Sequence, residues 1–208
     1  MKRIFVTGID TNIGKTVVAA ILTEALEADY WKPIQTGDLE NSDTKVVQRL
    51  VSNSKSVFHP EAYRLTQALS PHAAAAVDGV TIDMEKLRAS IPSTNGRDLI
   101  IEGAGGAMSP VTETSVVLDL IKTLDAEAVI VSKNYLGSIN HTLLTIDAMR
   151  RRGLPIVGVF FNGKPVQSSV DFILRYSGVK PLGFIDEEET LDREVVKRYA
   201  HLFRKEFR

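Results

Sequence analysis

The feature that most constrains the fold is the segment GIDTNIGKT, which occupies residues 8–16. It follows a short apolar β-like run at residues 3–7 and precedes an apolar helix-like run at residues 17–22. A glycine-rich loop between a strand and a helix can wrap a phosphate chain with backbone N–H groups, while a lysine contacts the phosphates and a hydroxyl contacts Mg²⁺. The segment therefore predicts a phosphate-binding loop in which Lys15 and Thr16 are those two side chains. Its first glycine stands one residue further from Lys15 than usual, so Ile9 occupies the place where a glycine is expected.

The composition limits the class of protein. The chain has 208 residues, of which 44% are hydrophobic, and a formal net charge of −1, which suits a single domain with one buried core. Acidic and basic residues are interspersed, so a nucleic-acid role has no electrostatic support. The absence of cysteine excludes disulfides, thiolate zinc sites and a cysteine nucleophile. Since no apolar run reaches the roughly 18 residues of a membrane span, we expect one cytoplasmic domain over residues 1–208, with no membrane partner.

The hydrophobic pattern predicts an α/β fold. Continuous apolar, β-branched runs are typical of buried parallel strands, and they occur at residues 4–6, 30–34, 99–101, 128–131, 156–161 and 181–185. Helical patterns are expected at residues 17–28, 43–51, 83–90, 115–124, 138–152, 168–176 and 188–205, with N-caps at Ser42, Thr81, Ser115 and Ser138. Residues 52–79 interrupt this rhythm, and such insertions often carry substrate contacts. We predict a mostly parallel sheet of about six or seven strands with helices on both faces.

Polar residues follow several of these strands. Glu102 ends one strand and precedes a glycine-rich segment, so it could reach Mg²⁺ while the glycines allow close approach to a phosphate. Lys32 follows the second strand, where a second cation beside Lys15 could neutralise charge on a transferring phosphoryl group. Asp43, at a helix start, could complete a metal shell with Thr16 and Glu102. Taken singly, these residues are also compatible with a solvated glutamate, a surface lysine and a first-turn acid that favours the helix dipole.

Two later strand ends carry further candidates. Residues 137–141, GSINH, begin a long helix whose free N–H groups and Asn140 amide would suit a carboxylate or phosphate, although a capped helix without a ligand fits equally well. Asn162 could read the edge of a purine, or form a simple Asn-Gly turn. His72 and His141 have no metal-ligand spacing and are interpreted as structural or solvated. The amphipathic C-terminal helix is expected to dock on its own domain rather than on a membrane.

Six motifs, taken in order, resemble the dethiobiotin synthetase family. They are GIDTNIGKT at 8–16, KP and TG at 32–33 and 36–37, NSD at 41–43, SPH at 70–72, EGAGG at 102–106 and GSINH at 137–141. The loop of that family also has five residues before its Gly-Lys-Thr, so Ile9 becomes expected. The resemblance implies an ATP-dependent ligase that forms the cyclic urea of dethiobiotin. In that reaction 7,8-diaminopelargonate captures CO₂ as a carbamate, the γ-phosphate activates it as a carbamic–phosphoric anhydride, and the second amine closes the ring.

The resemblance also implies a role for each motif residue. Thr11, Lys15 and Lys32 would be catalytic, and Thr16, Asp43 and Glu102 would hold Mg²⁺. The residues implied to bind ATP are Asn12, Ile13, Gly14, Lys15, Thr16, Val17, Asp43, Glu102, Gly103, Ala104, Gly105, Asn162 and Gly163. Thr36, Gly137, Ser138 and Asn140 would bind the substrate, and the last three would do so across the interface of a homodimer.

Three positions depart from the family pattern. Asn12 replaces a common glutamate, Thr36 replaces a serine, and GFIDE at residues 183–187 lacks the proline expected where the family contacts the base. We therefore expect weaker discrimination of ATP from other triphosphates.

Two alternatives share this type of sheet and loop. A partitioning or septum-positioning ATPase, which is a dimerising switch, needs a second lysine early in the loop, where this chain has Asp10. An amidase of cobyrinate type needs a cysteine nucleophile, and the chain has no cysteine.

Overall fold

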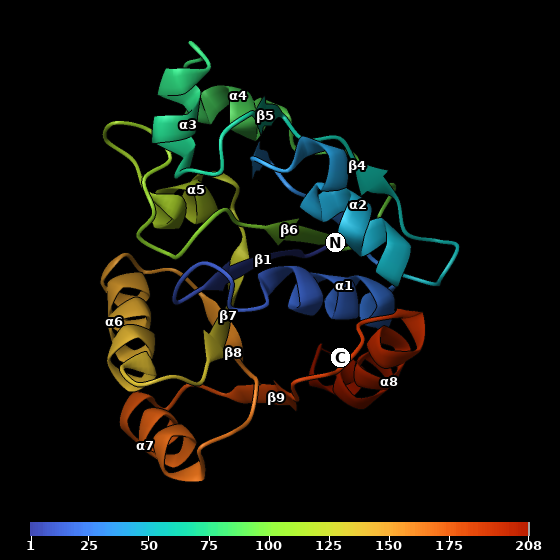
Figure 1. The fold of residues 1–208 in the computed structure, drawn as a ribbon, viewed down its shortest axis with the longest axis vertical. Helices are drawn as coiled ribbons and strands as arrows, with labels where there is room; N and C mark the ends of the chain where they lie inside the picture. Colours follow the sequence, from blue (N-terminus) through green and yellow to red (C-terminus); the bar gives the residue numbers. More distant parts are fainter. Residues whose placement is uncertain (208) are drawn as a thin grey trace.

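The computed structural model describes residues 1–207, and in that range the central sheet contains seven parallel strands (Figure 1). Their spatial order is β4-β2-β6-β1-β7-β8-β9. Their bounds are β1 Arg3–Gly8, β2 Asp29–Trp31, β4 Phe58–His59, β6 Leu99–Glu102, β7 Glu127–Lys133, β8 Ile156–Asn162 and β9 Pro181–Ile185. The predicted fold class is confirmed, and β1, which leads into the glycine-rich loop, lies between β6 and β7.

Helices cover both faces of the sheet. One face packs against α1 (Lys15–Leu26), α2 (Asp43–Leu50) and α8 (Arg193–Phe203). The other packs against α3 (Pro71–Val77), α4 (Met84–Ala89), α5 (Val117–Thr123), α6 (Ser138–Arg151) and α7 (Gln167–Ser177). Two short 3-10 turns, η1 (Leu39–Asn41) and η2 (Arg204–Phe207), complete the described helical elements. The result is a three-layer sandwich with two hydrophobic cores (Figure 1).

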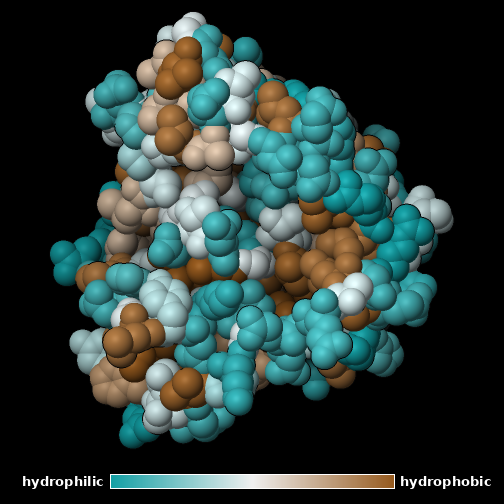
Figure 2. All heavy atoms as spheres, in the orientation of Figure 1, coloured by the Kyte–Doolittle hydropathy of each residue, from teal (hydrophilic) through white to brown (hydrophobic). Residues whose placement is uncertain are grey.

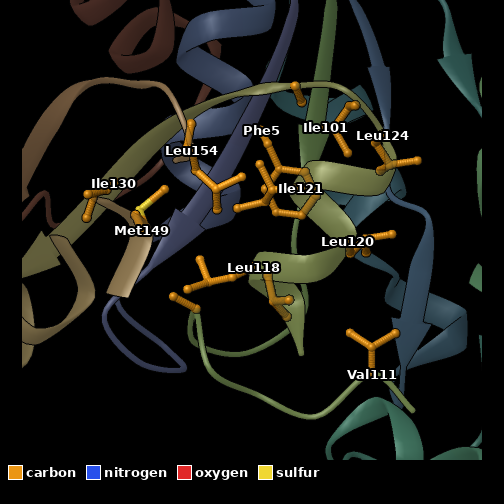
Figure 3. Close-up of a cluster of buried hydrophobic side chains, with 14 of the residues drawn as sticks. Phe5, Ile101, Val111, Leu118, Leu120, Ile121, Leu124, Ile130, Met149 and Leu154 are labelled. Carbon is orange, nitrogen blue, oxygen red and sulfur yellow. The ribbon is translucent and has the colours of Figure 1, made fainter. Parts of the chain in front are cut away.

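Strand β1 shows why the sequence forms this sandwich. Successive side chains of a strand point to opposite faces, so a strand with both faces covered needs a continuous apolar run. Ile4 and Val6 enter the core beneath α1, whereas Phe5 enters the core beneath α5. Figure 3 shows Phe5 among Leu118, Ile121 and other aliphatic side chains of the second core. The rigid central strand therefore fixes where the following loop begins.

The predicted single strand at residues 30–34 is wrong. Strand β2 ends at Trp31, and after Pro33 the chain pairs in a separate two-stranded sheet, in which β3 (Ile34–Thr36) lies parallel to β5 (Tyr63–Leu65). Proline has no N–H to give to a ladder, and here the carbonyl of Pro33 instead accepts from Ala62 and Tyr63. This small sheet carries Thr36 away from the main sheet and forms one side of the cleft described below.

Several predicted helix starts are also wrong. Asp83, not Thr81, caps α4, because its carboxylate accepts from the backbone N–H groups of Glu85 and Lys86. Helix α5 begins at Val117, and Ser115 lies in the preceding turn. The helix expected from residue 188 begins at Arg193, after the cap Asp192.

The C-terminal helix α8 docks on its own domain, as expected. Phe203 packs against Phe160 of β8 with ring centroids 5.1 Å apart, and Tyr199 and Val196 join the same core. Figure 2 shows apolar residues gathered along α1, between α2 and α8, on a face that is otherwise mainly polar. Over residues 1–207, the structure contains no helix with the length and apolar character of a membrane span.

Candidate functional site

The glycine-rich loop follows β1 and leads into α1. Ile9 continues the pairing with β7, because its N–H donates to the carbonyl of Val131 at 3.1 Å. The left-handed backbone falls later, at Asn12 (φ 56°) and Gly14 (φ 94°). A side chain at Gly14 would also place its Cβ 2.2 Å from the Asn162 amide. The extra residue at position 9 therefore lengthens the strand pairing and does not require glycine.

Asn162, at the end of β8, supports this loop from the side. Its amide nitrogen donates to the carbonyl of Ile13 at 2.8 Å. Asn162 therefore lies beside the loop, and neither Asn162 nor Gly163 lines the cleft in front of it. In this structure the Asn162 amide thus fixes the loop, and contact with a base stays a prediction.

Lys15 begins α1 and is nearly buried, with 7% of its surface exposed. Its Nζ donates to the carbonyl of Asp10 at 2.8 Å, across the loop. Burial lowers the pKa of Lys15 to about 8; Glu102 opposes this effect, and the nearby charge of Lys32 adds to it. The negative charge of a phosphate chain bound in the loop would stabilise the protonated form of Lys15 and raise its pKa again. Lys15 is therefore suited to binding phosphate.

Four side chains from four parts of the chain meet beside the loop. The hydroxyl of Thr16 lies 2.8 Å from Glu102 Oε1 and 3.2 Å from Asp43 Oδ1. The Nζ of Lys32 lies 2.6 Å from Asp43 Oδ2 and 3.3 Å from Glu102 Oε1, and it also donates to the carbonyl of Gly103 at 3.3 Å. The structure thus brings the predicted metal ligands and the second lysine together.

Burial makes this cluster electrostatically strong. Lys32 and Glu102 are 4% and 1% exposed. Burial by itself would lower the pKa of Lys32, but attraction to Glu102 and Asp43 outweighs it and the pKa is raised, so the ammonium stays charged. Burial raises the pKa of Glu102, an effect that Lys32 opposes and Asp43 reinforces. The cluster holds a fixed positive charge between two carboxylates at the edge of a solvent-accessible cleft.

The donor set fits Mg²⁺. Thr16, Asp43 and Glu102 bring a hydroxyl and two carboxylate oxygens to one point, and Mg²⁺ prefers oxygen ligands and keeps waters or phosphate oxygens in its remaining positions. The Thr16 hydroxyl has one proton and can donate it to only one of its two carboxylate neighbours at a time. The other carboxylate oxygen therefore keeps a lone pair that a cation could use. Within residues 1–207, no group of three His, Cys, Asp or Glu side chains is arranged to hold a metal, so a site here would depend on phosphate oxygens as well.

A cleft with a volume of about 750 Å³ opens in front of the cluster. The predicted site residues that line it are Thr11, Asn12, Gly14, Lys15, Thr16, Val17, Lys32, Thr36, Asp43, Glu102, Gly103, Ala104 and Gly105. Its outer wall comes from residues 68–71 in the segment 52–79, where substrate contacts were expected. Ile13 is buried behind the loop, with 3% of its surface exposed, and does not line the cleft.

The predicted substrate residues after β7 lie elsewhere. Gly137 and Asn140 line a second cleft, of about 770 Å³, together with Lys164 and Val166, while Ser138 is buried beneath it. The side chain of Leu136 beside them is fully exposed, at 104%. Within one chain these residues and Thr36 therefore border different clefts.

Several residues at the site were missed by sequence reasoning. Tyr30, fully buried, donates to Glu102 Oε2 at 2.8 Å. Gln35 accepts from the N–H of Asp43 at 3.2 Å and donates to the carbonyl of Gly37 at 3.0 Å. Their positions two residues before and three after Lys32 were the available signal, since polar groups next to a strand end that carries a candidate lysine face the same site. Ser70 also lines the cleft and belongs to the SPH motif at 70–72, whereas Asp38 and Ser109, which line it too, had no comparable signal.

The fold and the geometry of the site identify the general class of protein. A phosphate-binding loop at the end of the central parallel strand, with a hydroxyl, two carboxylates and two lysines beside it, is that of a P-loop nucleotide-binding protein. The chain is similar in fold to the cell division ATPase MinD of Pyrococcus furiosus, with a TM-score of 0.61, 17% identity and 99% of each chain covered. It is also similar to a ParA family ATPase of Chlorobium tepidum, with a TM-score of 0.59, 15% identity, and 96% of this chain and 98% of that one covered. At these identities the likeness concerns the fold alone.

Relatives with much higher identity identify the family. A family model described as an AAA domain matches residues 2–195. The ATP-dependent dethiobiotin synthetase BioD of Cytophaga hutchinsonii is 50% identical over 200 residues, which cover 96% of each chain. The enzyme of the same name from Christiangramia forsetii is 50% identical over 204 residues, covering 98% of this chain and 97% of that one. The chain therefore belongs to the dethiobiotin synthetase family, as its motifs had suggested.

Proposed function

We propose that this chain catalyses the ATP-dependent formation of dethiobiotin from 7,8-diaminopelargonate and CO₂, and that residues 1–208 act as one ligase domain. The observation that carries the proposal is the buried cluster of Lys32, Asp43, Glu102 and Thr16 beside the phosphate-binding loop. Full-length relatives at 50% identity support the same reaction. The structure is compatible with a cyclo-ligase because activation of a carbamate by phosphoryl transfer needs fixed charge, and not a protein nucleophile.

The two lysines have separate tasks in the proposed reaction. Lys15, at the loop, binds the phosphates of ATP, and Thr11 lies at the same rim of the cleft. Lys32, held by Asp43 and Glu102, is placed to stabilise charge on the carbamate and on the transferring phosphoryl group. A carbamate oxygen attacks the γ-phosphorus and ADP leaves; the second amine then attacks the carbamate carbon, and phosphate leaves as the ring closes. The carbamic–phosphoric anhydride is hydrolytically fragile, so the reaction requires the bound substrates to displace water from the cleft beside Lys32 and Glu102.

Mg²⁺ is part of the proposal. Thr16, Asp43 and Glu102 are the residues that would hold it. When bound, Mg²⁺ would supply positive charge for the phosphate oxygens during transfer.

We further propose that the active unit is a homodimer in the cytoplasm. Thr36 lines the first cleft, whereas Gly137 and Asn140 line the second cleft and Ser138 is buried. Gly137 has φ 107° and precedes α6, where the N–H of Ser138 already donates to the carbonyl of Tyr135 at 3.0 Å, so the exposed Asn140 and the next N–H groups of the first turn are the donors that would suit a carboxylate. In the dimer these groups receive the carboxylate of a substrate whose amines lie in the first cleft of the neighbouring subunit.

We propose that the chain discriminates weakly between ATP and other triphosphates, because the residues expected to contact the base depart from the family pattern. Asn162 donates to the carbonyl of Ile13, and Asp186 follows Ile185 where the family has a proline. We expect kcat/KM for ATP and GTP to differ by less than about a hundredfold, which corresponds to about 2.7 kcal/mol. A larger ratio in steady-state assays with each nucleotide would contradict this expectation.

The likeness to partitioning ATPases does not favour their function here. A switch of that type needs a lysine early in the loop, and position 10 is an aspartate. Liposome co-sedimentation compares the full chain with a chain ending near Glu188. ATP-dependent binding by the full chain alone would favour the switch.

The decisive experiment supplies diaminopelargonate, bicarbonate, MgATP and the protein, and detects dethiobiotin by mass spectrometry. The wild type is expected to form the product, and Lys32→Ala is expected to abolish it. Lys122→Ala, which removes an exposed lysine outside the cleft, is the matched control and should remain active. Absence of product with the wild type would reject the reaction, while a fully active Lys32→Ala protein would reject only the mechanism.

A further inference from the structure

The two oxygens of Glu102 have different surroundings. Oε1 faces the cleft and lies 2.8 Å from the Thr16 hydroxyl and 3.3 Å from Lys32 Nζ. Within the described range 1–207, Oε2 points away from that side and accepts from Tyr30 alone, at 2.8 Å. The carboxylate plane is therefore set by donors at both ends, and the Tyr30 hydroxyl is the donor behind the site.

Tyr30 is well placed for this task because it is rigid. It lies in β2, is 0% exposed, and packs its ring against Phe58 at a centroid distance of 6.3 Å. Strand β2 is paired with β6, the strand that ends in Glu102, and the register sets Tyr30 opposite Ile100. Burial raises the pKa of the Tyr30 phenol well above its ordinary value, and the Glu102 charge adds to the effect, so the hydroxyl keeps its proton and remains a donor.

We propose that Tyr30 is a positioning residue of the reaction, which holds Glu102 so that Oε1 is presented to the metal and to Lys32. The inference rests on the proposed function, because it assigns Glu102 to the metal. Without the hydroxyl, Oε2 would be a buried acceptor with no partner. The carboxylate could then rotate so that either oxygen accepts from the Thr16 hydroxyl or from Lys32 Nζ. Oε1 would no longer have a fixed orientation.

The role is distinct from that of a merely structural tyrosine. A structural hydrogen bond affects the stability of the fold, whereas an orienting one affects metal affinity at constant fold. Support from behind a ligand typically changes metal affinity or activity by about 10- to 100-fold. Because Tyr30 does not line the cleft, affinity for the organic substrate should be unaffected by its hydroxyl.

The test compares Tyr30→Phe with Tyr63→Phe. Tyr63 is also nearly buried, at 5% exposed, and its hydroxyl accepts from the N–H of Asp83 at 2.9 Å, outside the cleft. The first measurement is the Kd of Mn²⁺ in the presence of ADP. Electron paramagnetic resonance detects the free Mn²⁺, so the measurement needs no turnover. We expect Tyr30→Phe to raise this Kd about tenfold and Tyr63→Phe to leave it unchanged.

Kinetics and melting give two further readouts. Tyr30→Phe should lower kcat about tenfold while the KM for diaminopelargonate stays constant. If the variant is marginally stable, the Tm increase caused by MgADP can still be measured, and it should shrink in Tyr30→Phe but not in Tyr63→Phe.

Four outcomes are distinguishable. A raised Mn²⁺ Kd in Tyr30→Phe alone supports the inference. Wild-type Mn²⁺ affinity in Tyr30→Phe overturns it, as does an equal loss in both variants, which would assign Tyr30 to stability only. If Tyr30→Phe alone binds Mn²⁺ more weakly but the wild type forms no dethiobiotin, the proposed reaction fails, while Tyr30 still orients Glu102 at the metal site.

Discussion

The short strand β2 has a buried carboxylate cluster at each end, and the two clusters differ in their surroundings: the first is enclosed among protein groups, whereas the second borders a cleft. At the amino end, Asp29 is 0% exposed and contacts Arg97 Nε and Nη2 (2.7 and 3.2 Å), His59 Nε2 (3.0 Å) and the N–H of Val57 (3.1 Å). At the carboxyl end, Glu102 and Asp43 share Lys32 and Thr16 and open onto a cleft.

The difference separates a cluster that stabilises the fold from one that binds a ligand. Every oxygen of Asp29 has a donor, so the amino-end cluster is electrostatically complete. The carboxyl-end cluster adds Lys15, whose pKa burial lowers to about 8 and whose Nζ, among residues 1–207, donates to the carbonyl of Asp10 alone. A site built for a charged ligand keeps such groups unsatisfied until the ligand arrives.

The largest expected effect comes from removing the charge of Lys15. Lys15→Met should lower kcat/KM at least about 10³-fold, or about 4 kcal/mol, because the lysine contacts the transferring phosphates. The free energy of unfolding without nucleotide should not fall, since burial disfavours the charged form in the folded state. Steady-state kinetics and urea unfolding measure the two quantities. A large loss of stability would show that Lys15 belongs with the fold-stabilising groups.

Asp29→Asn should have the opposite profile. It leaves Arg97 without its buried charge partner and should lower the free energy of unfolding by about 3 kcal/mol, while folded protein retains its activity. Asp125→Asn is the matched control, because Asp125 is 96% exposed and lies 3.7 Å from Arg3, so its loss should change stability by less than about 1 kcal/mol. Equal effects of the two substitutions in urea unfolding would break the comparison between buried and exposed pairs.

Acid should remove the contribution of Asp29 in a defined window. Burial by itself raises the pKa of Asp29, but its contacts with Arg97, His59 and Val57 outweigh burial and hold the pKa below the ordinary value. A carboxyl with a depressed folded pKa stabilises the protein above the unfolded pKa, which is about 3.9, and loses that effect as the pH falls through the folded value. The stability difference between wild type and Asp29→Asn should be constant from about pH 5 to 7 and shrink below about pH 4. A difference that grew on acidification would contradict this sign.

The smallest effect is expected for Gln35→Ala, which sharpens the comparison within the carboxyl-end cluster. Gln35 joins the start of α2 to Gly37 through its two amide atoms, so its loss should allow Asp43 to shift. We expect losses of about 1 kcal/mol in stability and about fivefold in kcat/KM, typical of one hydrogen-bonding side chain. Gln67→Ala, at an exposed position, is the control and should change neither quantity. Unchanged kinetics in Gln35→Ala would mean that α2 holds Asp43 without help.

Local patterns anticipated most of the fold. The buried strands, the loop and the longer helices follow from apolar periodicity and glycine placement, which act over a few residues. Pro33 could have warned that residues 30–34 are not one strand, but its carbonyl partners at Ala62 and Tyr63 are about thirty residues away. Thr81 and Asp83 are both good N-caps by residue type. Asp83 is the cap because α4 begins at Met84, which the residue types alone did not show.

The site shows the same division. Lys15, Thr16, Lys32, Asp43 and Glu102 could be named because each follows a strand or begins a helix at one edge of a parallel sheet. Tyr30 and Gln35 had only their nearness to Lys32 as a signal, because their hydrogen bonds to Glu102 and to the start of α2 at Asp43 depend on the tertiary fold.

By itself the sequence determined the phosphate-binding loop, the family and the identity of the charged groups, since these depend on residue type and short spacing. The tertiary structure alone decided which oxygen meets which donor, that the extra residue at Ile9 extends β-pairing with Val131, and that residues 137–140 border a different cleft from Thr36. The physical reason is that orientation, burial and pKa depend on groups far apart in the chain, which only packing brings within hydrogen-bonding distance.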